Sequence, residues 1–461
     1  MTELHTSESG PRWRPYPAYK DSGVPWLGKI PAHWEVKRIK HTSYIKGRIG
    51  WKGLRSEEFI DEGPYLITGT DLVNGQVVWE SCYHVNEERY NEDPYIIVRE
   101  NDLLITKDGT IGKTAIVRNF TGKATLNSGI FLVRPKNKNY IVDYLYWLLN
   151  SHVFTAFIDY SKVGSTISHL YQNIFVELKF PIPTGAEQQA VSQFLLKETA
   201  KIDALVAKKE RQIELLQEKR TALISRAVTR GLDPNVPLKD SGIDWLGHIP
   251  AHWTFQKLKY VSSIRLSSVD KKFADAEISV LLCNYVDVYY NKYITPNINF
   301  MEATATNREI DEFKLKKGDV LITKDSESWD DIAIPAYVLE ELDGVLCGYH
   351  LAQIRSYADI VNSEYLFWSF YATGINYQFK VAATGITRYG LGKYWLDNAF
   401  ILVPSIEEQR AIADFLERET AKIDALITKI RGSIDKLKEY RTALISAAVT
   451  GKIDVRKEVA R

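Results

Sequence analysis

Cysteine is scarce in this 461-residue chain, and neither sign of charge is in excess. The three cysteines, Cys82, Cys283 and Cys347, show no C-x-x-C spacing, which excludes a disulfide framework and a cysteine-ligated zinc site. We therefore expect the reducing environment of the cytoplasm. The 59 lysine and arginine residues nearly balance the 58 aspartate and glutamate residues, for a net charge of +1. This balance excludes a uniformly basic protein but leaves room for a local basic face.

Long apolar runs are also missing. No stretch of 18 consecutive apolar residues occurs, which argues against a transmembrane helix. Residues 1–20 are polar and rich in proline and aromatic residues, and they lack the apolar segment of a signal peptide. We expect a loosely attached tail there and no membrane partner. The remaining chain is long enough for two to four globular domains.

One stretch of the chain occurs twice, at 187–229 and at 408–450. The blocks ETAKIDAL and RTALIS recur letter for letter in both copies, at a constant offset of 221 residues. Such self-similarity indicates a duplicated structural unit. Both copies are rich in helix-forming residues, neither contains proline, and Gly432 is the only glycine in either. Each copy therefore predicts a long helix, spanning roughly 60 Å.

The ends of both predicted helices carry their own signals. Thr184 precedes Glu187 by three residues, and Ser405 precedes Glu408 in the same way, which is the pattern of a capping box. A glycine follows each copy, at positions 231 and 451, where a helix can end.

Apolar residues recur along both copies at heptad spacing, which is typical of a helix that faces a partner helix. We expect the two helices to pair with each other, antiparallel; the alternative is that each packs on its own domain. The predicted helix-pairing residues are Ile202, Val206, Ile213, Leu216 and Leu223 in the first helix, and Ile423, Ile427, Ile434, Leu437 and Leu444 in the second.

The duplication extends beyond the helices, because residues 21–40 and 240–259 share a WLG-x-IP-AHW element. We expect its tryptophans to pack on the edge of a domain. His33 and His252 are interpreted as structural rather than catalytic residues, because no serine, cysteine or metal ligand accompanies them at a fixed spacing.

Between the shared elements, short apolar runs alternate with turn signals and predict strands. In the first half we expect strands at 64–69, 75–80, 101–110, 112–117, 129–135 and 177–183, and a helix at 141–160. In the second half we expect strands at 278–290, 318–326 and 349–357, and a helix at 361–380.

The predicted fold class is α+β, with two similar mixed α/β domains separated by two long antiparallel coiled-coil helices and related by a pseudo-two-fold axis. The expected divisions are a tail and first domain at 1–183, a long helix at 184–232, a second domain at 233–404, and a second helix with a short tail at 405–461. The helices and framework motifs are nearly identical in the two halves, whereas the sequences between them differ. This contrast favours a duplicated recognition protein over a duplicated enzyme.

No catalytic constellation is recognisable, and we expect neither catalytic residues nor metal ligands. The GTIGKT segment at 109–114 resembles a phosphate-binding loop but has two residues instead of four between its glycines. Residues 93–95 read D-P-Y, one proline short of the D-P-P-Y motif of adenine methyltransferases. Residues 177–179 read E-L-K, half of a nuclease motif without an acidic partner.

Basic and polar loops are the remaining candidates for a binding site. Lysine and arginine supply phosphate contacts, while hydroxyl, amide and guanidinium groups read base edges. The alternative is ordinary solvated surface charge. The predicted DNA-binding residues are Lys107, Lys113, Lys123, Ser165 and Thr166 in the first half, and Lys324, Thr387, Arg388, Tyr389 and Lys393 in the second.

Taken in order, the duplicated IPxHW elements, the D-x-L-I-T-K strands, the P-x-x-x-EQ segments and the ETAKIDAL…RTALIS helices resemble the specificity subunit of type I restriction–modification enzymes. The resemblance covers nearly the whole chain beyond residue 20. It implies two target-recognition domains, each reading one half of a split site on double-stranded DNA. It also implies that the conserved helices dock two methyltransferase subunits, which restriction subunits join.

The resemblance further implies a chain without catalytic activity or cofactor of its own. S-adenosylmethionine, ATP and Mg²⁺ are expected on the partner subunits. Because the two halves differ in sequence, the half-sites should differ, and a two-fold protein would meet them about 34 Å apart. Helix length is then expected to set the spacer. Three alternatives stay open: a coiled-coil scaffold that binds no DNA, an orphan specificity subunit without active partners, and a DNA-modifying enzyme in one chain.

Overall fold

The computed structural model describes residues 13–48, 56–161 and 169–458. The chain forms two compact units. Unit 1 comprises Met1–Lys209 and Gly432–Arg461, and unit 2 comprises Glu210–Arg431. The division passes through both long helices. Each unit therefore contains one α+β domain and a part of each helix, and each is described below by itself.

Unit 1 is built on a four-stranded antiparallel sheet whose central strand β9 is buried along its whole length. The strand order of this sheet is β10 (Thr114–Ile116), β9 (Leu103–Thr106), β12 (Ile130–Pro135), β4 (Ser43–Gly47). A second sheet has the order β11 (Ala124–Leu126), β5 (Ile60–Ile67), β8 (Tyr83–His84), with β11 parallel to β5. Three strand pairs complete the unit: β1 (Tyr19–Asp21) with β2 (Lys29–Pro31), β3 (Glu35–Arg38) with β13 (Lys179–Ile182), and β6 (Leu72–Val73) with β7 (Gln76–Val77).

The short helices of unit 1 are α1 (Ile39–Thr42), α2 (Glu87–Asn91), α3 (Val142–Leu149), α4 (His152–Ser161) and α5 (Gln172–Phe175). Helices α3 and α4 pack between the four-stranded sheet and the long helices. Their aromatic and aliphatic side chains share one hydrophobic cluster with both. A separate cluster fills the space between the two sheets.

Unit 2 repeats this plan with a longer sheet. Its five-stranded sheet has the order β17 (Ser262–Leu266), β25 (Leu351–Ser356), β21 (Val320–Thr323), β23 (Pro335–Val338), β19 (Tyr293–Ile294). Its three-stranded sheet has the order β20 (Met301–Ala305), β18 (Ile278–Cys283), β24 (Val345–Cys347). The strand pairs are β14 (Leu238–Asp240) with β15 (His248–Pro250), β16 (Thr254–Lys257) with β27 (Phe400–Val403), and β22 (Asp325–Ser326) with β26 (Tyr389–Gly390). The short helices are α7 (Leu258–Val261), α8 (Tyr285–Tyr290), α9 (Asn307–Phe313), α10 (Ser363–Tyr371), α11 (Thr373–Ala382) and α12 (Lys393–Asn398).

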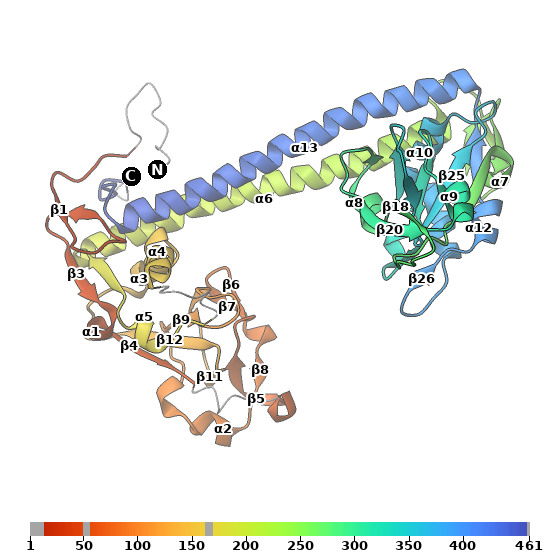
Figure 1. Ribbon diagram of the computed structural model, residues 1–461. Coiled ribbons are helices and arrows are strands. Elements are labelled where there is room, and N and C mark those ends of the chain that lie inside the picture. The colour runs from red at the N-terminus through yellow and green to blue at the C-terminus, as the bar shows by residue number, and fades with distance from the viewer. Residues whose placement is uncertain (1–12, 49–55, 162–168, 459–461) are drawn as a thin grey trace. The chain divides into compact units, whose positions relative to one another are not determined.

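The two long helices are α6 (Gly185–Arg230) and α13 (Ile406–Val449), drawn in yellow-green and blue in Figure 1. With 46 and 44 residues they are about 65–70 Å long. Both predicted capping boxes form: the Thr184 hydroxyl lies 2.9 Å from the Glu187 carboxylate, and the Glu408 amide donates to Ser405 at 3.2 Å. Both helices stop at the predicted glycines. There the backbone has a positive φ of 74° at position 231 and 68° at 451.

Within unit 1, α6 and α13 run antiparallel, as expected. The Tyr144 hydroxyl contacts the carbonyls of Pro181, just before α6 begins, and Val449, where α13 ends. Farther along both helices, Asp203 pairs with Arg441 at 2.8 Å. In unit 2 the same ion pair forms with the roles of the helices exchanged, because Arg220 of α6 lies 3.4 Å from Asp424 of α13.

The predicted helix-pairing residues lie on the inward stripe of each helix. Ile202 and Leu444 belong to the core of unit 1, Val206 and Leu437 pack against it, and Leu223 packs on the core of unit 2. The others are buried or half-buried along their own helices, namely Ile213, Leu216, Ile423, Ile427 and Ile434. Their individual pairings stay a prediction.

Three of the predicted elements are wrong. The single helices expected at 141–160 and 361–380 are each broken into two, at Asn150–Ser151 and at Ala372. The strand expected at 278–290 ends at Cys283. There Asn284 and Asp287 form a capping box that starts helix α8 instead.

Candidate nucleic-acid interface and the frame that positions it

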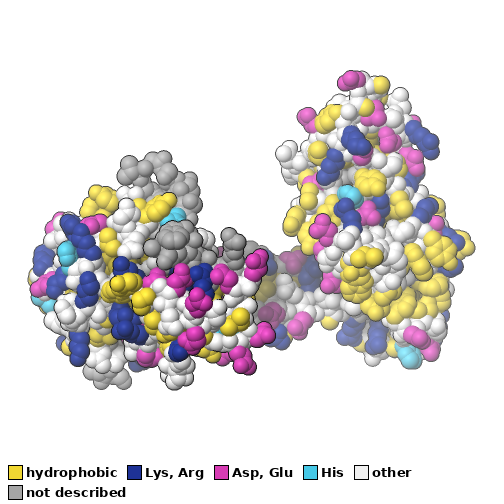
Figure 2. All heavy atoms as spheres, turned by 90° about the horizontal axis from the view of Figure 1, so that it is seen from below, with side chains coloured by type: hydrophobic (Ala, Val, Ile, Leu, Met, Phe, Trp, Pro, Cys, Tyr) yellow, Lys and Arg dark blue, Asp and Glu magenta, His cyan; other side chains and the backbone are white. Residues whose placement is uncertain are grey.

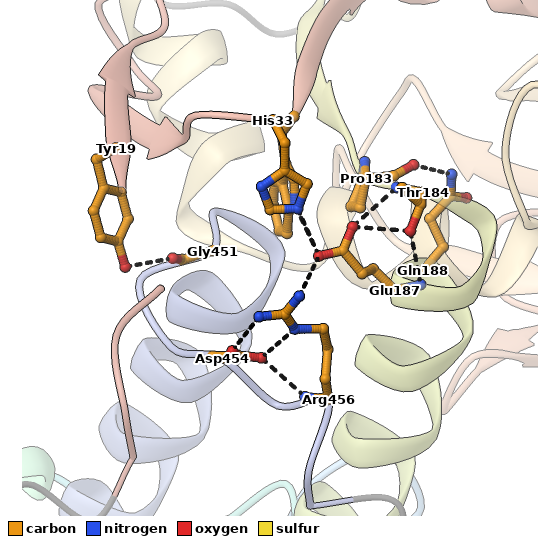
Figure 3. Close-up of polar contacts among 10 residues, drawn as sticks. Tyr19, His33, Pro183, Thr184, Glu187, Gln188, Gly451, Asp454 and Arg456 are labelled. Carbon is orange, nitrogen blue, oxygen red and sulfur yellow. Dashed lines mark hydrogen bonds and ion pairs between the residues drawn. The ribbon is translucent and has the colours of Figure 1, made fainter. Parts of the chain in front are cut away.

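In each unit, one glutamate connects the first turn of a long helix to the IPAHW element. In unit 1, Glu187 Oε1 lies 2.8 Å from His33 Nε2 and accepts a hydrogen bond from the Trp34 indole at 3.4 Å, while Oε2 closes the capping box with Thr184. The Arg456 guanidinium, from the segment after α13, lies 4.0 Å from the same carboxylate (Figure 3). The IPAHW element thus positions the start of α6. His33 is structural, as expected.

Unit 2 repeats the contact with less shielding from solvent. Glu408 lies 2.9 Å from His252 Nε2 and accepts a hydrogen bond from the Trp253 indole at 3.2 Å. Its side chain is 38% exposed, against 6% for Glu187. The two copies of one motif therefore differ mainly in burial.

The neighbouring glutamine attaches the helix start to the domain. Gln188 donates to the carbonyl of Pro183 at 3.0 Å and accepts from the amide of Ile141 at 2.8 Å, and it is almost fully buried. Gln409 makes the same contacts with Pro404 and with the amide of Asn362. These contacts explain the P-x-x-x-EQ motif, because the glutamate caps and the glutamine satisfies two buried backbone groups.

The frame of each unit uses both copies of the duplicated helix. Helix α4 begins where His152 N donates to Ser446, the serine of the second RTALIS block, at 2.9 Å. Helix α11 begins where Thr373 N donates to Ser225, the serine of the first block, at 2.9 Å. Each unit therefore takes its EQ motif from one copy and its RTALIS motif from the other.

The carboxylate of Glu187 predicts an acid sensitivity. Burial by itself raises the pKa of Glu187, but hydrogen bonds from His33, Thr184 and Trp34 outweigh it and hold the pKa below its ordinary value of about 4.3. A lowered pKa contributes stability above that ordinary value, and the contribution is lost as pH falls through the folded-state pKa. We expect the free energy of unfolding to fall below about pH 4. Denaturant unfolding of wild type and Glu187→Gln between pH 3 and 7 checks this; a slope that survives in Glu187→Gln must arise elsewhere.

The two candidate DNA-binding lysines at the ends of β9 and β21 pack against neighbouring side chains and are not free at the surface. Lys107 is 8% exposed and lies over the Phe131 ring, 5.2 Å from its centre. Lys324 lies over Tyr349 and pairs with Asp325 at 3.3 Å. Both side chains are better placed to support the neighbouring loop than to meet a phosphate.

The structure does bring the candidate groups together in each unit. The amide of Leu170 donates to the carbonyl of Lys107, and the amide of Leu391 donates to that of Lys324, both at 2.8 Å. In unit 1 the chain after α4 thus returns to the end of β9, and in unit 2 the chain after α11 returns to the end of β21. Ser165 and Thr166 lie outside the described residues. Thr387 and Arg388 are exposed on the loop in unit 2, and Tyr389 is half-buried in β26.

The other candidate lysines differ in how free they are. Lys123 pairs with Glu87 at 2.6 Å, and Lys393 donates to the carbonyl of Ile264 at 3.0 Å. Lys113 is exposed, and its side chain has no ion pair within the described ranges. On the face shown in Figure 2, Lys and Arg side chains lie among acidic and hydrophobic ones in both units, so positive charge is local there.

A hollow of about 500 Å³ that lies in unit 2 was not predicted from the sequence. It is lined by Tyr285 and Tyr289 of α8, whose rings stack 5.6 Å apart, and by Ser326 and Ser328. Arg388 also lines it. The asparagine–aspartate spacing at 284–287 was the signal for α8, but the aromatic and β-branched run around it resembled a strand.

The catalytic look-alikes have structural explanations. The GTIGKT segment joins the antiparallel strands β9 and β10, whereas a phosphate-binding loop leads into a helix. Asp93 accepts from the amide of Tyr95 and starts a short turn of 3-10 helix, and Glu177 pairs with Lys40 and Arg38. The described residues contain no group of three His, Cys, Asp or Glu side chains placed to hold a metal ion. Among the described helices none is long and apolar enough to cross a membrane.

Comparisons with known proteins agree with this duplicated architecture. Residues 31–215 and 253–436 each match the family described as type I restriction modification DNA specificity domain. The type I restriction enzyme MjaVIII specificity subunit of Methanocaldococcus jannaschii is 25% identical, over 93% of this chain and 95% of the relative. The EcoKI specificity subunit of Escherichia coli K12 is 20% identical, over 92% and 90%.

Among solved structures, a chain from a study of complex assembly and conformational transition of the type I R-M system superposes with a TM-score of 0.69 at 15% identity. The match covers 92% of this chain and 99% of that one, and at this identity it supports the fold alone. The two family matches together cover most of the described chain. The chain therefore belongs to the type I restriction modification DNA specificity family, whose domain it contains twice.

Proposed function

We propose that this chain is the DNA-binding specificity subunit of a type I restriction–modification complex, and that it recognises a bipartite, asymmetric DNA site. One observation carries the proposal. Both units share one frame, down to the Glu187 and Glu408 contacts, but they differ where the domains are open to a ligand. After the equivalent strands β5 and β18, unit 1 continues into the β6–β7 hairpin and unit 2 into helix α8. Two domains that share a framework but carry different elements at the surface suit two different half-sites.

The proposal includes partners that the resemblance implies. Two methyltransferase subunits would dock on the duplicated helices, and restriction subunits would join that core. Each unit offers an equivalent frame made from both helix copies, which suits two copies of one partner. The function would be exercised on DNA in the cytoplasm. S-adenosylmethionine, ATP and Mg²⁺ would bind to the partner subunits, as the family resemblance implies.

The experiment combines an activity assay with sequencing. The isolated chain should transfer no methyl group, cleave no DNA and hydrolyse no ATP. Co-expressed with methyltransferase subunits of its own strain, it should direct methylation to one split, non-palindromic motif. Turnover by the isolated chain would point to an enzyme in one chain. A chain that shifts no random duplex in gel electrophoresis, alone or with partners, would point to a scaffold.

A further inference from the structure

Helix α8 and the Arg388 loop line an open hollow in which two charged side chains, Arg388 and Glu327, are unpaired within the described residues. Arg388 and Glu327 both line the hollow of about 500 Å³ in unit 2. Both side chains are exposed, and within the described part of the chain neither makes a hydrogen bond or an ion pair. The acidic residues around them are already engaged: Asp331 accepts from the Tyr289 hydroxyl at 3.3 Å, and Asp330 pairs with Lys380 at 3.1 Å.

The walls of this hollow are held in place by hydrogen bonds. The Tyr285 hydroxyl lies 3.2 Å from the Ser326 hydroxyl, which also accepts from the amide of Ser328 at 3.2 Å. Val288, on the inner side of α8, is buried in the core. Helix α8 and strand β22 are therefore tied together by side-chain contacts, and Glu327 and Arg388 stand next to β22 and its partner strand β26.

The outer side of α8 is unusually apolar for a surface helix. Val286 is 54% exposed and Tyr290, one turn later, is 78% exposed. The major groove of B-DNA is about 12 Å wide and admits an α-helix, and apolar side chains there contact thymine methyl groups. The six-residue helix α8, about 9 Å long, is small enough to fit.

The charges decide which part of DNA fits the hollow. A carboxylate repels phosphate, so Glu327 makes this a poor site for the DNA backbone. A base-pair edge carries no net charge and offers both acceptors and donors. Guanine presents O6 and N7 to an arginine, and cytosine presents its N4 amino group to a glutamate.

We propose, on the basis of the proposed function, that α8 reads the major groove and that Arg388 and Glu327 together recognise one G·C base pair of the half-site bound by unit 2. Arg388 donates to guanine and Glu327 accepts from cytosine. Unit 1 places the β6–β7 hairpin where unit 2 has α8, so its half-site is read by different groups.

The test maps the methylated motif of the full chain co-expressed with methyltransferase subunits of its own strain. Arg388→Lys keeps the positive charge but loses the two-pronged donor geometry. We expect preference for G·C at one position of one half-site to drop about 10- to 100-fold. Glu327→Gln should relax the same base pair, and the other half-site should be unchanged. Arg308→Lys is the matched control, because this arginine is exposed on α9 of the same unit; it should give the wild-type motif.

Three results would overturn the inference. They are an unchanged motif in both variants, relaxation in the other half-site, or an equal loss of affinity for all sequences, which marks a phosphate contact. A wild-type complex that yields no split motif would be a different outcome, because it would reject the proposed function as well.

Discussion

Replacing Glu187 with alanine is expected to lower the free energy of unfolding by about 3 kcal/mol. The carboxylate is 6% exposed and serves four groups at once: His33, Trp34, Thr184 and the Arg456 guanidinium. Removing it leaves the buried Trp34 indole without an acceptor, which costs more than the loss of one hydrogen bond. It also removes the cap of α6.

The duplication supplies the matched control. Glu408→Ala removes the same motif residue in unit 2, but that side chain is 38% exposed, so water replaces much of what is lost. We expect about 1 kcal/mol there. Urea unfolding followed by circular dichroism measures both variants. If both variants lose the same free energy of unfolding, or if Glu187→Ala loses less than about 0.5 kcal/mol, burial of the Glu187 carboxylate does not stabilise unit 1.

Replacing Leu444 with aspartate should cost about 4 kcal/mol or more. Leu444 is 1% exposed and lies in the cluster that joins the end of α13 to α6, α3 and α4. A charge placed there has no partner and loses its hydration. Because the same cluster supports the frame proposed to dock a methyltransferase subunit, co-purification with that subunit should also fail.

Thr442→Asp controls for charge on the same helix. Thr442 is exposed, two residues before Leu444, and its replacement should change the free energy of unfolding by no more than about 0.5 kcal/mol. Thermal melting and co-purification of both variants are the measurements. If Leu444→Asp melts and assembles like Thr442→Asp, the inward stripe of α13 has been misplaced.

The long helices could be predicted closely from the sequence because their signals are local. A capping box joins residues three apart, and a terminal glycine acts through its own backbone. Strands β9, β12, β21 and β25 were likewise predicted, since their buried runs are continuous in the sequence, whereas β4, β17 and β23 were not expected.

The features that were missed depend on distant residues. The breaks after α3 and α10 contain no proline, and the following helix begins on the hydroxyl of Ser446 or Ser225, 294 and 148 residues away. The burial of the Lys107 side chain could not be predicted either, because a lysine at the end of a strand is usually exposed. The contact between Glu187 and Arg456, in the segment after α13, also joins residues that are far apart in the sequence.

The two units are proposed to read DNA independently. Exchange of residues 1–183 for the same region of a relative with a different motif tests this most directly, since the exchange ends at the residue before the α6 cap. Methylated sites of the chimera, co-expressed with the methyltransferase subunits, should be mapped by sequencing. The account predicts that one half of the motif changes to that of the relative while the other half stays as in wild type. A change in both halves, or in neither, would contradict it.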